Sequence, residues 1–108
     1  MDFEDVRLTD LLDKAERRAK GILESRKISE VKQLGADVQA VYNFFVTAQN
    51  AYEKQQPMLK NLFSSFNYAA VIVNDAIKKK TLDSEANELL GECLQIIISC
   101  CSNIKNSL

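Results

Sequence analysis

The sequence predicts an all-α protein, an antiparallel up-down-up-down bundle of four helices. Apolar side chains recur at alternating spacings of three and four in four successive stretches, which is the period of one helix face. The 108 residues include only three glycines and one proline, so the residues that punctuate all-β chains are scarce. Short connections at 26–28, 56–57 and 81–83 would make consecutive helices antiparallel neighbours. The length fits one domain, residues 1–108.

The first helix is expected over residues 3–25, with Asp2 as its N-cap. Its apolar stripe runs through Leu8, Leu11, Leu12, Ala15, Ala19, Ile22 and Leu23. Acid–base pairs four residues apart occupy the other faces: Asp10 with Lys14, Asp13 with Arg17, and Glu16 with Lys20. We interpret these charges as a solvated helix face.

The second helix is expected over residues 30–55, with Ser29 as its N-cap. Its stripe is Val31, Leu34, Val38, Val41, Phe45, Ala48 and Tyr52. Gly35 inside this helix indicates close packing against a neighbour. Pro57 separates the second helix from the third, because proline favours a first helical turn and restricts the residue before it. The alternative, one kinked helix over 29–80, would span about 78 Å, too long for this domain.

The third and fourth helices, expected over residues 57–79 and 85–106, carry more apolar surface than a bundle seam requires. No charge lies between Asn61 and Asn74, so the third helix is either buried on most sides or leaves an apolar face exposed. Residues 78–80, all lysine, suit the negative end of its dipole. Asp83 or Ser84 caps the fourth helix; a buried strand within 93–101 is the alternative there.

The predicted core takes the central stripe of each helix. It comprises Leu12, Ala19, Ile22, Leu34, Val38, Val41, Phe45, Ala48, Leu62, Phe66, Ala69, Val73, Leu90, Cys93, Ile97, Cys100 and Ile104. Cys93 and Cys100, seven residues apart, are interpreted as small core residues and not as metal ligands. Cys101 is expected to neighbour the core and is a candidate exposed thiol. An odd number of cysteines near one end predicts no disulfide framework and a reducing, cytoplasmic location.

The sequence lacks the residues that several kinds of catalytic and cofactor-binding site require. The chain has no histidine, so Ser-His-Asp and Cys-His catalysis, di-iron bundle sites and histidine-ligated haem or zinc are not available. Glycine-rich phosphate loops are absent as well. We therefore expect no cofactor and no metal, and we expect the protein not to be an enzyme. The net charge of −1 gives no overall basic surface for nucleic acid. No apolar run is long enough for stable membrane insertion, and the acidic start does not resemble a secretory signal.

The leading functional hypothesis is a non-enzymatic protein–protein interaction module: an adaptor, a small inhibitor of the immunity type, or a chaperone-like partner. It would bind a protein partner or a second copy of itself, as a homodimer, through an apolar face of the third and fourth helices. The contact residues predicted for this face are Phe63, Tyr68, Val71, Ile72, Glu85, Glu88, Glu92 and Ile96. In size and layout the chain is similar to the immunity proteins that protect bacteria from their own bacteriocins; this similarity lies in architecture and transfers no residue.

Two other hypotheses stand beside it. The first is a carrier of a small molecule or lipid, with a cavity between helices lined by Phe44, Phe45, Phe63 and Phe66. The second is an enzyme that uses Cys101 or a pair of glutamates at helix spacing as its reactive group. Each depends on a cavity or a cleft that a sequence pattern alone does not define.

Overall fold

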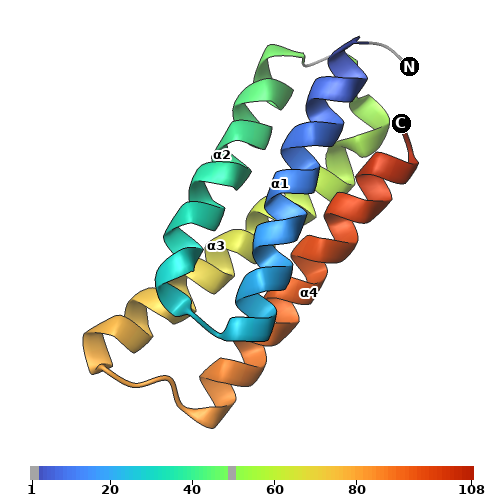
Figure 1. The fold of residues 1–108 in the computed structure, drawn as a ribbon. Helices are drawn as coiled ribbons and strands as arrows, with labels where there is room; N and C mark the ends of the chain where they lie inside the picture. Colours follow the sequence, from blue (N-terminus) through green and yellow to red (C-terminus); the bar gives the residue numbers. More distant parts are fainter. Residues whose placement is uncertain (1–2, 49–50) are drawn as a thin grey trace.

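A computed structural model describes residues 3–48 and 51–108 of the chain. The elements follow in the order α1 (Phe3–Ser25), a 3₁₀ turn (Ile28–Glu30), α2 (Val31–Thr47), a second 3₁₀ turn (Glu53–Gln55), α3 (Gln56–Lys79) and α4 (Ser84–Asn106). These helices lie side by side, each antiparallel to the next (Figure 1). The predicted four-helix bundle is confirmed, and no strand occurs in these described residues. The three isoleucines of 96–98 lie within α4, so the strand alternative is wrong.

The helices pack in the cyclic order α1, α2, α3, α4, and each contacts the two beside it. α4 has the most extensive contacts, with α3 on one side and α1 on the other, whereas α2 and α3 contact each other least. The bundle is elongated, with dimensions of 45 × 21 × 18 Å. The seam between α2 and α3 is therefore the loosest of its four sides.

Most of the predicted core is buried, but the buried faces are wider than predicted. Phe45, Ala48 and Phe66 were expected in the core and are only partly buried. The buried hydrophobic side chains outside the predicted core are Leu8, Ala15, Val31, Phe44, Tyr52, Leu59, Ala76, Leu94 and Cys101. Each helix faces two neighbours, so a stripe broader than one seam is removed from water.

The predicted extent of the second helix is wrong. α2 ends at Thr47, whose hydroxyl donates to the Phe44 carbonyl oxygen at 2.8 Å. Tyr52 keeps the apolar spacing but lies beyond the end of the helix, and it is buried where its hydroxyl donates to an Asp5 carboxylate oxygen at 2.8 Å. Residues 49–50 lie outside the described residues. The connection to α3 is thus longer than the predicted 56–57, and one kinked helix over 29–80 is excluded.

Helix ends follow the local sequence in part. Asp83 caps α4, accepting a hydrogen bond from the Ala86 amide at 2.8 Å, and Pro57 lies in the first turn of α3. Ser29, the predicted N-cap of α2, lies instead in a 3₁₀ turn, and Glu30 precedes the helix without a side-chain cap. Asp2, the predicted cap of α1, is outside the described residues.

Arg26 ends α1 in the left-handed conformation, with φ of 58°. Its guanidinium reaches α4, donates to the Asn87 carbonyl oxygen at 3.1 Å and covers Gly91. A Cβ on Gly91 would lie 3.1 Å from a guanidinium nitrogen. The first connection is therefore attached to the fourth helix through this one side chain.

Candidate binding surfaces

Three of the predicted contact residues lie together in a groove between α3 and α4, here called the α3–α4 groove. Tyr68 from α3 and Glu92 and Ile96 from α4 line a hollow of about 260 Å³. A second hollow of about 530 Å³ continues from it and shares Glu92 and Ile96. Tyr68 is 54% exposed and Ile96 is 41% exposed. Both apolar side chains are thus accessible to a partner.

The other predicted contact residues are placed differently. Val71 is well exposed on the outer side of α3, while Ile72 is partly buried against the core. Glu85 and Glu88 are exposed and continue the line of Glu92 toward the start of α4. Phe63 does not belong to this groove, because it lies on the α2 side of α3. The predicted set therefore does not form one continuous surface.

Sequence reasoning missed the small polar residues of the α3–α4 groove. They are Asn61, Ser64 and Ser65 on α3 with Gln95, Ser99 and Asn103 on α4. The sequence could have indicated them, because the residues of each helix recur at spacings of three or four on the side that carries Tyr68 in α3 or Ile96 in α4. Such short side chains keep the groove open and let another backbone approach it.

The groove has an acidic border. No lysine or arginine lines either hollow. Glu85, Glu88 and Glu92, here called the glutamate strip, make no ion pair with any of the residues that the structure describes. The electrostatic potential along this edge is therefore negative.

The three cysteines are buried, which corrects the expectation of an exposed thiol at Cys101. Cys101 is fully buried, and desolvation raises the pKa of its thiol to about 12. Burial also raises the pKa of Cys93 and of Cys100, which lie along the α3–α4 groove; for Cys93 the Glu92 charge adds to this effect. A thiolate is the nucleophilic form of cysteine, so Cys101 is a poor candidate for the reactive group of an enzyme.

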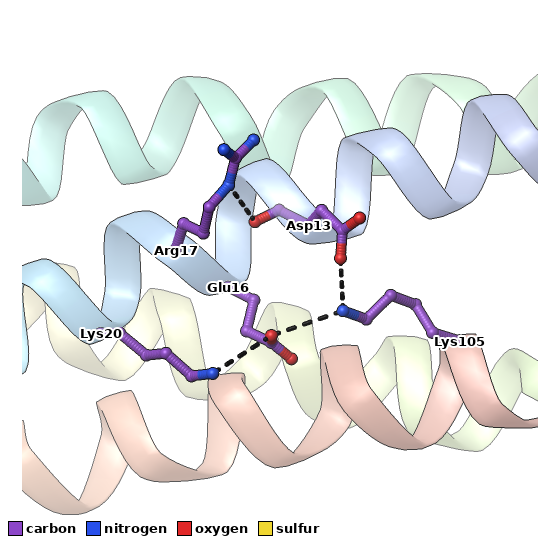
Figure 2. Close-up of polar contacts among 5 residues, drawn as sticks. All are labelled: Asp13, Glu16, Arg17, Lys20 and Lys105. Carbon is purple, nitrogen blue, oxygen red and sulfur yellow. Dashed lines mark hydrogen bonds and ion pairs between the residues drawn. The ribbon is translucent and has the colours of Figure 1, made fainter.

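A charged cluster joins α1 to α4 (Figure 2). Lys105 donates to Asp13 and lies 3.4 Å from a Glu16 carboxylate oxygen, which Lys20 also approaches at 3.4 Å. The Asp13 hydrogen bond is the main cause that raises the pKa of Lys105. Of the predicted pairs on α1, the Glu16–Lys20 pair forms, whereas Arg17 contacts the Asp13 main-chain oxygen at 3.4 Å. The acidic and basic side chains of this cluster pair with one another, so we interpret it as a structural contact between α1 and α4.

A second groove, here called the α2–α3 groove, lies along the loosest seam. Phe66 divides it into hollows of about 230 Å³ and 500 Å³. A Cβ on Gly35 would lie 2.9 Å from the tip of the Phe66 ring, which confirms that this glycine permits close packing. Phe63 lines the smaller hollow and packs edge-on against Tyr42, with centroids 5.3 Å apart. Phe44 instead faces α1, under the Arg7 guanidinium, so the four phenylalanines do not share one cavity.

The described residues form neither a metal site nor a membrane-spanning helix. Within residues 3–48 and 51–108, no group of three or more histidine, cysteine, aspartate or glutamate side chains is arranged to hold a metal ion. None of the helices in this part of the chain has the length and apolarity needed to cross a bilayer.

Comparison with known proteins adds no relative. No family model matches the chain, and neither the curated proteins nor the solved structures contain a significant match to it.

Proposed function

We propose that this protein is a non-enzymatic interaction module that binds a helix of a partner protein in the α3–α4 groove. One observation carries the proposal: exposed Tyr68 and Ile96 flank a hollowed surface on a stretch of α3 that has no charged residue. Tyrosine is enriched among the residues that dominate binding energy at interfaces, where an aromatic ring adds apolar area at little entropic cost.

The shape of the groove suits a helix. Its α4 side extends from Leu89 to Asn103, which is about 21 Å at 1.5 Å per residue, or roughly four helical turns. The serines at 64, 65 and 99 have short side chains. A second helix can therefore approach closely enough for its apolar side chains to reach Tyr68 and Ile96. Recognition of an amphipathic helix in an apolar groove is a recurrent binding mode.

The charges of the surface favour a protein over nucleic acid. The glutamate strip would repel a phosphate backbone and attract lysine or arginine at one end of a partner helix. Three reduced, buried cysteines support a reducing compartment, and we place the module in the cytoplasm.

Selection of helical peptides from a display library on the immobilised full chain tests this function. We expect enriched peptides to lose binding on Ile96→Asp and on Tyr68→Ala. Val6→Asp is the matched control, because Val6 is 42% exposed on α1, against 41% for Ile96 on α4. Failure to enrich any peptide, or equal loss on Val6→Asp, would contradict the proposal.

The carrier hypothesis has weaker support. Only Phe63 and Phe66 of the four phenylalanines line the α2–α3 groove, and this groove is open to solvent. An apolar ligand there would leave much of its surface in water, whereas small-molecule sites usually enclose most of the ligand. Isothermal titration with a medium-chain fatty acid tests the alternative directly, with Phe66→Ala, which enlarges the groove, as the comparison.

A further inference from the structure

The α2–α3 groove lies within a face that is almost free of charge. Between Gln33 and Tyr52 the chain has one charged residue, Asp37, and its carboxylate turns toward α1, where Arg18 lies 2.5 Å away. Between Asn61 and Asn74 it has none. The middle of this long face therefore presents glutamine, asparagine and apolar side chains alone, in a protein with 27% charged residues.

The same face carries projecting side chains as well as hollows. Tyr42 is half-exposed at one end of it and Ile77 is 56% exposed at the other. The hollow of about 230 Å³ lies on the Tyr42 side of Phe66, and the hollow of about 500 Å³ lies on the Ile77 side. A surface with both features can fit a copy of itself, because a two-fold axis brings the projection of each copy to the hollow of the other.

We propose that a second copy of this chain covers the α2–α3 face, in an antiparallel two-fold dimer. The axis would pass near Gln39 and Asn67, which lie at the middle of α2 and of α3 and both line the smaller hollow. Tyr42 follows Gln39 by three residues toward one end, so the rotation places it beside Gly35 of the other copy, where the smaller hollow meets Phe66. The tyrosine ring supplies the apolar group that the hollow can accept.

Charge and size support this arrangement. Lys32 is the exposed charge at the border of the larger hollow. A parallel dimer would bring the two copies of Lys32 together, whereas the antiparallel dimer separates them. The bundle measures 45 × 21 × 18 Å, so one long face offers roughly the 800 Å² per partner of a standard stable interface.

Sedimentation equilibrium of the full chain tests the dimer. We expect a mass about twice 12.2 kDa at micromolar concentration. Ile77→Asp should weaken the dimer at least about tenfold, since both copies bring a charge into an apolar interface. Val6→Asp and Ile96→Asp are the controls and should leave the dimer intact. A monomer at 100 μM overturns the inference, and so does loss of the dimer on Ile96→Asp alone.

Cross-linking gives a second, independent readout. In the proposed dimer the two copies of residue 39 face each other across the axis, so Gln39→Cys should form an intermolecular disulfide under mild oxidation. Gln95→Cys, the same change at an exposed glutamine of α4, should not. The three native thiols are buried and contribute little background. Equal cross-linking of the two variants would contradict the dimer, and neither result bears on peptide binding in the α3–α4 groove.

Discussion

The buried carboxylate of Asp37 is the point at which a single substitution should reveal how α1 and α2 are held together. Asp37 is 5% exposed and pairs with Arg18, which is 33% exposed, at 2.5 Å between Nε and Oδ2. Lys14 approaches the other oxygen only to 3.8 Å and is largely in solvent. Arg18 is therefore the main partner of a charge that has left water.

The two partners should have unequal effects. Arg18→Met keeps the aliphatic stem but strands the Asp37 carboxylate, and we expect it to lower the free energy of unfolding by about 3 kcal/mol. Asp37→Asn leaves a guanidinium that is a third exposed and can turn to water, so its cost should be about 1–2 kcal/mol. The double variant should cost little more than Asp37→Asn alone, which corresponds to a coupling of about 3 kcal/mol.

Urea unfolding followed by circular dichroism at 222 nm measures these differences at a fixed protein concentration. Arg17→Met is the matched control, because the neighbouring arginine contacts only the Asp13 main-chain oxygen, at 3.4 Å. Its effect should stay within about 0.5 kcal/mol. If Arg18→Met cost no more than Arg17→Met, the carboxylate would have to be solvated, and the description of the α1–α2 contact as a buried ion pair would be wrong.

Three further predictions concern stability. The folded chain keeps the Cys101 proton up to about pH 12, while the unfolded chain releases it near pH 9. The free energy of unfolding should therefore fall between these pH values by up to about 1.4 kcal/mol per pH unit. Cys101→Ala should make this fall less steep, measured by urea titrations at pH 8, 9 and 10. Asp83→Ala removes the cap of α4 and should cost about 1 kcal/mol, measured by thermal unfolding. Gly21→Ala places a Cβ with nothing within 4 Å and should stabilise the protein by about 0.5–1 kcal/mol. Gly91→Ala places its Cβ against the Arg26 guanidinium and should not stabilise it. Equal gains in stability from the two variants would contradict the Arg26–Gly91 contact.

Helix period predicted the fold because it is a local property of the chain. It located four helices, and three of them to within one residue at each described end. It failed at the end of α2, where Tyr52 keeps the helical spacing but follows the last helical residue, Thr47, and is buried beside Asp5 and Phe44. The spacing of apolar residues alone does not distinguish a helix that continues from a buried residue that follows the end of a helix. Only the contacts of Tyr52 with Asp5 and Phe44 do so.

The candidate site was partly predictable for the same reason. Tyr68, Glu92 and Ile96 were predicted as contacts because each stands off the core stripe of its helix. Phe63 was grouped with them because the sequence does not say which neighbour lies on which side of α3. Cys101 was expected at the surface for a similar reason: α4 packs against both α1 and α3, so its buried face is wide enough to include it. Side-chain exposure at the edge of a stripe depends on which helices are adjacent.

The two proposed surfaces lie on opposite sides of α3, so they can be occupied together. A dimer through the α2–α3 face would leave both α3–α4 grooves open, one on each copy, and the two grooves would run antiparallel to each other. A tandem of two partner helices joined by a flexible linker of suitable length should then bind the wild-type chain much more tightly than one helix does, because the second contact is intramolecular.

Ile77→Asp should abolish this gain while it leaves the affinity for a single helix unchanged, since Ile77 borders the α2–α3 groove and lines neither hollow of the α3–α4 groove. Ile96→Asp should weaken single and tandem helices alike. Comparison of the single-helix and tandem affinities of the three proteins therefore separates the two surfaces: a tandem gain that survives Ile77→Asp would mean that the copies do not meet through the α2–α3 face, even if peptides bind beside Tyr68 as proposed.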